Sequence, residues 1–311
     1  MNGMLGLLHL ATFFPPWVDE EPFLVTGLAL GGVYALSGVG LIVLFRTTGV
    51  LNLSFGAVGA FGALIAWQLI NHSGLNQWLA YLVCILFAGV VTLVYGMVFG
   101  RALADRDPLV KATASLGVTL ILLGIMDLLW TSSGGASRAI TLPTDNHGFM
   151  VGQVTVSTTD VIALAVGVVI TVTTTIFLRV SRLGTAMRAM ASDREITATL
   201  GVPVARVEAC AWFGCGVLAG IAGILLADLV ALDATTLTFL VISSIAATLI
   251  ARLSSIAVTF LAAIVIGVVE SMVVPIESLT NYADATPFVL AVIALLVLSR
   301  TRALSGERQG F

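Results

Sequence analysis

The stretch "TTGVLNLSFGAVGAFGALIAWQLINHSGLNQWLAYLVCILFAGVVTLVYGMVFG" (Thr47–Gly100) contains no Asp, Glu, Lys or Arg. A helix needs ~20 apolar residues to cross a hydrocarbon layer of ~30 Å. The stretch therefore holds two membrane spans, separated by the polar hinge Asn71–Gln77. The whole chain is 59% hydrophobic and 10% charged, with a mean hydropathy of +1.09. These values exclude an ordinary soluble protein and indicate an integral membrane protein.

The remaining apolar runs predict an all-α integral membrane protein, a polytopic bundle of about eight to ten transmembrane segments. Backbone groups in lipid must bond within their own segment, so runs of this length are expected to be helices. The two runs beside Arg252 are either two spans or a span and a half-span. No linker interrupts the pattern, so residues 1–311 are expected to form a single transmembrane domain. The runs are 23–45, 50–70, 78–100, 109–130, 161–178, 208–227, 236–251, 253–271 and 286–299.

The basic residues set the direction of the spans, because Lys and Arg concentrate on the cytoplasmic side. If the first span runs from outside to inside, thirteen of the fourteen basic residues lie inside and only Arg138 lies outside. The N-terminus is then outside and the C-terminus cytoplasmic. The apolar residues 1–16 lack a basic leader, so we expect a short interfacial segment there and not a cleaved signal peptide.

Two polar segments stand out from the apolar background. Residues 131–160 form the longest extracytoplasmic loop, and the alternating "GQVTVST" within it predicts a small folded hairpin. Residues 181–206, "SRLGTAMRAMASDREITATLGVPVAR", lie in the cytoplasm between two spans. Six charged residues lie in this one segment, although only 10% of the whole chain is charged. This concentration of charge suggests a specific role for the segment.

The cytoplasmic segment carries the signals of a short amphipathic helix. Ser192–Glu195 fits a capping box, which predicts a helix over 193–200. Ile196 and Leu200 share one face of that helix, and Gly201 is a natural stop. An ordinary basic loop and a helix lying on lipid headgroups are the alternatives. The cap, the apolar face and the stop together favour docking onto another protein.

Motifs for catalysis are absent from the sequence. There is no G-x-x-x-x-G-K-[ST], no H-E-x-x-H and no G-x-S-x-G, and Lys111 is the only lysine. The three cysteines lie inside apolar runs, and neither Cys nor His forms a cluster, so no metal site is indicated. The formal charge of −3 gives no reason to expect a nucleic-acid partner. We therefore expect no enzyme activity, no catalytic residue and no cofactor bound by this chain.

Polar side chains inside the apolar runs are the candidates for a transport path. Asn52 and Ser54 open the second run, and Thr113 and Ser115 lie in the fourth. Their spacing leaves two interpretations equally open: they bond neighbouring helices, or they line the path. Ladders of glycine in the first two runs are explained by close helix packing.

Charged residues near span ends are the candidates for an ion pathway. An intramembrane charge marks such a pathway by default. Each candidate, however, lies near the outer end of a run, where snorkelling to the interface accounts for it. This weakens a proton- or sodium-coupled carrier. The candidates are Asp127, Asp228 and Glu270.

Several stretches resemble the permeases of branched-chain amino-acid ABC transporters, the Liv-type family. "GLALGGVYALSGVGLIVLFRTTGVLNLSFGAVGAFGALIAW" (Gly27–Trp67) is similar to the glycine-rich opening of that family. "SRLGTAMRAMASDREITATLGVPVARV" (Ser181–Val207) resembles its cytoplasmic signature, and "GCGVLAGIAGILLA" resembles the small-residue span that follows. "GGASRAITLP" and "GVVES" are similar to an outer loop and a late motif. The resemblance covers residues 23–300 in order.

The resemblance implies the fold and partners of an ABC importer permease in a prokaryotic plasma (inner) membrane. Two homologous permeases, commonly different, would pair around a path. Two cytoplasmic ATPases would bind ATP and Mg²⁺ beneath them, and an extracytoplasmic binding protein would deliver the substrate. The cytoplasmic helix would be the coupling helix seated on the ATPase. The coupling residues so implied are Gly184, Met187, Arg188, Ala189, Asp193, Arg194, Glu195, Leu200 and Gly201.

One departure from the family pattern bears on packing and substrate. Where the family shows "LGGxGSxxGAxxGG", this chain has "IARLSSIAVTFLAA" (Ile250–Ala263), with Arg252 at a usual glycine position. We expect the helices there to lie farther apart or to pack differently. Branched-chain or related hydrophobic amino acids are the expected cargo. The alternatives are urea, short amides or aromatic acids in the same importer class, a stand-alone ion-coupled carrier, and a scaffold without transport.

Overall fold

The computed structural model describes residues 20–100, 102–103, 106–130, 140, 149–151, 154–230, 232–276, 285–294 and 296. The expected interfacial segment 1–16 and most of the loop 131–160 lie outside these residues. The helices are α2 (Glu20–Thr48), α3 (Phe55–Ser73), α4 (Gln77–Tyr95), the π-helix η1 (Gly96–Gly100), α5 (Pro108–Trp130), α6 (Thr158–Val180), α7 (Arg182–Ser192), α8 (Arg194–Thr199), α9 (Val204–Leu229), α10 (Ala234–Phe239), α11 (Val241–Ile250) and α12 (Ile256–Val273). Residues 286–294 are also helical.

The described helices confirm an all-α membrane bundle. Six of them are long and apolar enough to cross a membrane: α2, α4 with η1, α5, α6, α9 and α12. The run 236–251 is divided between two short helices, α10 and α11, which join at Leu240. Neither helix alone is long enough to span, and the apolar stretch Ala234–Ile250 is shorter than the six candidate spans. That it is a half-span stays a prediction.

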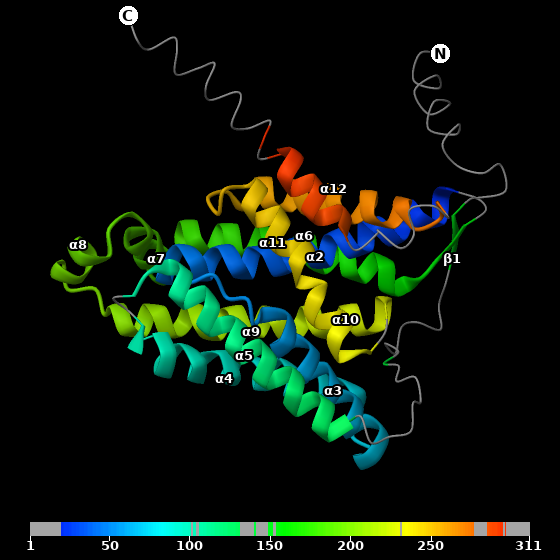
Figure 1. Ribbon diagram of the computed structural model, residues 1–311, viewed down its shortest axis with the longest axis horizontal. Helices are drawn as coiled ribbons and strands as arrows, with labels where there is room; N and C mark the ends of the chain where they lie inside the picture. Colours follow the sequence, from blue (N-terminus) through cyan, green and yellow to red (C-terminus); the bar gives the residue numbers. More distant parts are fainter. Residues whose placement is uncertain are drawn as a thin grey trace, which may run out of the picture.

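Helices α2 and α9 form the centre of the bundle. Helix α2 packs against α12, α6, α9 and α11, while α9 also packs against α4 and α3. Figure 1 shows α2, α6 and α9 running side by side, with α3, α4 and α5 on one side and α11 and α12 on the other. The side chains of Tyr34, Phe55 and Leu64 are fully buried in this centre.

The α2–α12 contact depends on glycines and corrects the expectation of wider spacing. A Cβ on Gly31 would lie 2.7 Å from Ile264 Cα, and one on Gly267 would lie 2.6 Å from the Gly27 carbonyl oxygen. The two backbones are therefore in direct contact. The glycines missing from 250–263 do not separate the helices, because α2 and Gly267 supply the small residues instead.

The connection between α11 and α12 carries strain. Arg252 has φ +53° and Leu253 has φ +54°, the left-handed region that favours glycine. Arg252 is the position where the resembling family has glycine. Arg46 on α2 donates from Nη1 to the Ser254 carbonyl oxygen at 3.1 Å, which fixes this turn to the end of α2.

The cytoplasmic segment and the hairpin predicted from the sequence lie at opposite ends of the bundle (Figure 1). Helices α7 and α8 lie at one end, beside the ends of α2 and α6 (Figure 1). The strands β1 (Phe149–Val151) and β2 (Val154–Val156) lie at the opposite end and pair antiparallel, with Phe149 opposite Val156. This confirms the hairpin predicted in the loop 131–160. Which end faces the cytoplasm stays a prediction.

Candidate functional site

Helix α7 is anchored to the bundle by its own small and apolar residues. The Ser181 hydroxyl caps it by accepting from the Gly184 amide at 2.8 Å. Gly184 lies directly on the end of α6, since a Cβ there would be 2.5 Å from Leu178 Cα. Met187 and Met190 are buried at 4% and 5% exposure. Helix α7 is therefore a fixed base for the segment that follows.

Helix α8 begins one residue later than the sequence predicted. Its cap is Asp193, whose Oδ1 accepts from the Ile196 amide at 2.9 Å. The predicted capping box with Ser192 as the cap is wrong. Ser192 is instead the last residue of α7, where its hydroxyl donates to the Arg188 carbonyl oxygen at 3.4 Å. Both residues are good caps, and α7 continues through Ser192, so the cap of α8 falls on Asp193.

Helix α8 presents an apolar pair to its surroundings. Ile196 is 60% exposed and Leu200 is 77% exposed, while Thr197 between them is buried. Gly201 follows with φ +83° and ends the helix, as predicted. Arg194 forms an ion pair with Glu208 on α9, with Nη2 and Oε1 2.9 Å apart. This short helix is thus capped by Asp193 and tied to α9 through its first residue, Arg194, with its apolar pair exposed.

The other expected coupling residues surround this helix. Arg188 is exposed, and its Nη2 donates to the Arg179 carbonyl oxygen at 3.4 Å, while Ala189 is half-buried. Glu195 is exposed in the first turn of α8. Arg188 and Arg46 both line a small hollow where α2, α6, α7 and α12 meet. The segment therefore touches several helices of the bundle.

The predicted path residues Asn52, Ser54 and Ser115 form an interhelical connection. Residues 49–54 are not helical, in contrast to the predicted run 50–70. Asn52 Oδ1 accepts from the Ser54 hydroxyl at 2.6 Å, and Ser115 on α5 accepts from the Leu53 amide at 3.0 Å. The Ser115 hydroxyl itself is shared between the Leu51 and Ala112 carbonyl oxygens. Non-helical backbone inside a membrane bundle needs such partners.

Thr113, the fourth predicted path residue, lies elsewhere. It is exposed, and its hydroxyl donates to the Val110 carbonyl oxygen at 2.9 Å within its own helix. Two residues along a helix are ~200° apart, so Thr113 and Ser115 point to nearly opposite sides. The structure brings three of the four residues together and places this one apart from them.

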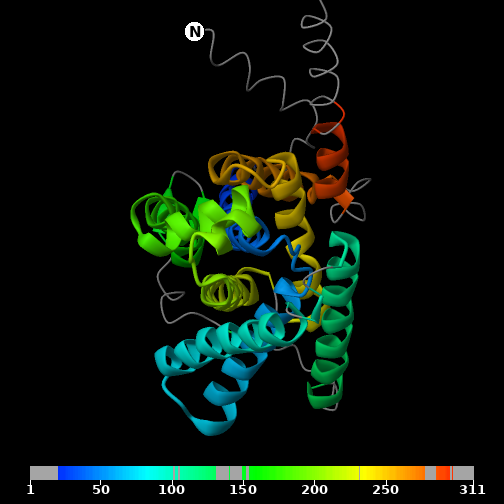
Figure 2. The same ribbon diagram turned by 90° about the vertical axis from the view of Figure 1, so that its left-hand side faces the viewer.

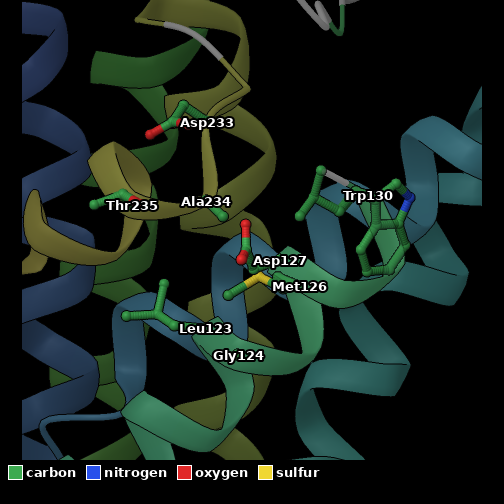
Figure 3. A pocket seen from close by; sticks show the side chains of 9 residues that line it. Leu123, Gly124, Met126, Asp127, Trp130, Asp233, Ala234 and Thr235 are labelled. Carbon is green, nitrogen blue, oxygen red and sulfur yellow. The ribbon is translucent and has the colours of Figure 1, made fainter. Parts of the chain in front are cut away.

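A hollow of about 340 Å³ lies between α5 and the start of α10, at the end opposite α8. Figure 3 shows Asp127 pointing from α5 toward Ala234, with Trp130 beside it and Asp233 above. Asp233 caps α10, since its Oδ2 accepts from the Thr236 amide at 2.8 Å. Asp127 is exposed, as a residue near a span end is expected to be.

Of the other two acids, one agrees with the snorkelling interpretation and one contradicts it. Asp228 is half-buried near the end of α9. Glu270 is only 7% exposed, and its two carboxylate oxygens each accept a hydrogen bond, from Tyr34 and from Ser243. Sequence position suggested an interface, but the two hydroxyl partners of Glu270 come from the distant α2 and from the preceding helix α11.

These features define a class: a polytopic membrane protein with broken helices inside the bundle and a braced apolar helix projecting from one end. Residues 23–298 match the sequence model of the family described as branched-chain amino acid transport system / permease component. The chain belongs to this family of membrane permeases. It is a multi-pass protein of the prokaryotic plasma membrane.

Relatives from bacteria and an archaeon cover most of the chain. The high-affinity branched-chain amino acid transport system permease protein LivH of Salmonella typhimurium is 25% identical over 88% of this chain and 91% of its own length. The corresponding protein BraD of Pseudomonas aeruginosa is 27% identical over 88% and 92%. A probable branched-chain amino acid transport permease, LivH of Methanocaldococcus jannaschii, is 27% identical over 82% of each chain.

Proposed function

We propose that this chain is a membrane subunit of an ATP-binding-cassette importer, and that it translocates branched-chain or related hydrophobic amino acids. The observation that carries the proposal is the apolar pair Ile196 and Leu200, exposed at 60% and 77% on a capped and braced helix. We infer that these two outward side chains contact a partner protein, because α8 lies outside the candidate spans and apolar surface exposed to water is unfavourable. An ATPase subunit on the cytoplasmic side would cover them.

The braces of α8 provide the mechanical connection that an importer needs. The Arg194–Glu208 ion pair links α8 to α9, one of the two central helices. On the other side, Met187 and Gly184 link α7 to α2 and α6. When the ATPases bind ATP and Mg²⁺ and close, α8 would move with them and displace these helices. Alternating access would follow from their repacking.

The partners follow from the same proposal. A second, homologous permease would complete the path, most simply as a heterodimer, and two ATPases would bind beneath. A binding protein outside would deliver the substrate to the end that carries β1, β2 and the hollow near Asp127. The relatives named as branched-chain amino acid permeases support leucine, isoleucine and valine as cargo.

The buried Glu270 favours one second candidate, an ion-coupled carrier that works without an ATPase. Such a carrier needs an acid within the bundle, and Glu270 is 7% exposed. Asp127 is exposed and does not meet that need. The two candidates differ in the energy source of uptake.

Reconstituted uptake separates these candidates. The complex is purified from native membranes in mild detergent and placed in liposomes with the binding protein outside. Uptake of radiolabelled leucine is then measured with ATP inside, or with a proton or sodium gradient and no ATP. We expect uptake that requires ATP. Uptake driven by a gradient alone would refute the importer, and ATP-driven uptake of urea in place of leucine would refute the substrate.

A further inference from the structure

A hollow of about 250 Å³ lies between α6, α7 and α9, near the end of the bundle that carries α8. Figure 2 faces this end and shows α6 in green and α9 in yellow-green on two sides of α2 in blue. Helices α6 and α9 pack closely against α2 and only loosely against each other. The hollow lies between them, and Gly40 and Val43 of α2 form its floor.

The hollow is open at one side and reaches the centre of the bundle at the other. Cys210 and Phe177 on its rim are exposed, whereas Cys215 and Gly40 at its inner part are buried. Gly214 also lines it, and a Cβ added there would meet nothing within 4 Å. Because α6 and α9 are both candidate spans, we expect the open side to face the membrane.

The interior of the hollow is apolar. Among the described residues that line it, Thr174 alone carries a hydroxyl, while glycines, cysteines and apolar side chains make up the rest. An apolar cavity holds no stable water, and a polar ligand would lose its hydrogen bonds on entering it. The interior therefore fits a hydrocarbon chain.

Two arginines lie at the mouth of this hollow, on the side of α8. Arg206 precedes Cys210 by four residues, which places both on the same face of α9. Arg182 directly precedes Leu183, which is a lining residue on α7. Both arginines are exposed, and neither forms an ion pair with another residue that the structure describes.

The acid closest to Arg206 in sequence is already neutralised, since Glu208 pairs with Arg194 of α8 at 2.9 Å. Two guanidinium groups therefore stand at the end of an apolar groove. A guanidinium group binds a phosphate through paired hydrogen bonds, and basic pockets between membrane helices bind the head groups of anionic lipids. A zwitterionic lipid brings its own ammonium group and is attracted less.

We propose that this groove binds an anionic phospholipid. Arg182 and Arg206 hold its phosphate group, and one of its acyl chains lies in the hollow beside Gly214. The lipid comes from the leaflet at the α8 end, which the positive-inside pattern makes cytoplasmic. The inference goes beyond the proposed function, because it depends neither on the substrate nor on the energy source of transport.

Alkylation of Cys210 tests this binding with a native reporter, because Cys84 and Cys215 are buried. The protein is purified with its accompanying subunits and placed in nanodiscs of dioleoylphosphatidylcholine, with or without dioleoylphosphatidylglycerol. Reaction of Cys210 with a membrane-permeant maleimide is followed by peptide mass spectrometry. We expect phosphatidylglycerol to slow the reaction severalfold, and glycerol 3-phosphate, the soluble head group alone, to have no effect.

Removal of the two arginines should remove the preference for the anionic lipid. In the double variant Arg182→Gln, Arg206→Gln, the amount of phosphatidylglycerol that gives half protection should rise roughly thirtyfold. Arg106→Gln is the matched control, since Arg106 is exposed between η1 and α5 and should leave the protection unchanged. All these arginines are exposed, so the variants should keep the melting temperature of the parent.

Filling the hollow tests the position of the acyl chain. Gly214→Leu should reduce the phosphatidylglycerol that is retained after delipidation, as counted by native mass spectrometry. This readout is used because a leucine at position 214 would itself shield Cys210. Gly117→Leu is the control, because its position on α5 is equally open and does not line the hollow, so it should retain as much lipid as the parent.

Several results would overturn the inference. They are equal alkylation in the two lipid compositions, protection that persists without both arginines, and protection by glycerol 3-phosphate, which needs no groove. Slow alkylation in phosphatidylcholine that becomes fast once an accompanying subunit is removed would also overturn it, because a protein then covers Cys210. Unchanged lipid retention in Gly214→Leu would refute the placement of the acyl chain.

Discussion

The exposed pair on α8 gives a prediction whose size follows from the structure. We expect the double variant Ile196→Ser, Leu200→Ser to weaken binding of the ATPase without harming the fold. Full burial of an Ile or Leu side chain stabilises by about 1.5–3 kcal/mol. The exposed fractions of Ile196 and Leu200 are 60% and 77%, and we scale the burial free energy of each side chain by its fraction. Docking of the ATPase can then contribute ~2–4 kcal/mol from the two side chains together. At ~1.4 kcal/mol per tenfold, the dissociation constant should rise by a factor of roughly 30 to several hundred.

The fold should tolerate the double variant because both side chains leave the helix outward. The cap from Asp193 uses the backbone amide of residue 196, so it persists with serine there. The Arg194–Glu208 ion pair and the buried Thr197 are untouched. We therefore expect the melting temperature of the purified permease to change by no more than 2 °C or so, as for surface changes of about 0.5 kcal/mol.

Affinity is measured by titrating fluorescently labelled ATPase into the permease in detergent or nanodiscs. Thr199→Ala is the matched control, since Thr199 is exposed on the same helix and its hydroxyl donates to a carbonyl of its own turn. It should leave the affinity within threefold of the parent. An unchanged dissociation constant in the double variant would refute docking through this face. A large fall in melting temperature would show that the two residues support the fold.

Three further predictions concern stability. Gly267→Leu should destabilise the bundle by ~1–3 kcal/mol through overpacking against α2, which would be measured as a lower melting temperature. Gly117→Ala is the control and should leave the melting temperature unchanged, because a Cβ at residue 117 would meet nothing within 4 Å. Arg252→Gly should stabilise by about 0.5–1 kcal/mol, because the left-handed φ of +53° suits glycine, whereas Arg252→Ala should bring no such gain. Ser115→Ala should cost ~1–3 kcal/mol by removing the acceptor of the part-buried Leu53 amide, and Thr113→Ala should cost less than ~0.5 kcal/mol. Equal effects of the two would contradict the assignment of Ser115 to the connection with the segment before α3.

The helices of the bundle could be predicted because each one follows from the length and hydropathy of a single continuous run of residues. Apolar runs such as 23–45 and 109–130 are long enough to span, and the lipid requires them to be helical. The described helices α2 and α5 contain these runs. Gly201 could be predicted for the same reason, since a helix stop with positive φ depends on one residue.

The start of α8 and the role of the polar residues could not be predicted this way. Ser192 and Asp193 are both strong caps, and the choice between them depends on how far α7 continues. Whether Ser115 bonds the backbone beside Asn52 depends on the position of α5 relative to residues 49–54, and no local sequence pattern contains that information. Hydropathy also hides the break at 49–54, because Val50, Leu51 and Leu53 are apolar whether helical or not.

Glu270 shows how tertiary neighbours reverse an interpretation drawn from position. It lies three residues before the end of α12 at Val273, a depth at which a carboxylate on an isolated helix reaches the interface. The glycine contact between α2 and α12 removes that option, because Gly27, Gly31 and Gly267 bring the two helices together along the face that carries Tyr34 and Glu270. Helix α11 then closes the remaining side with Ser243. The close packing that small residues allow is thus what holds this acidic side chain inside the bundle, and a substitution at Gly267 should disturb the hydrogen bonds of Glu270 with Tyr34 and Ser243 together with the fold.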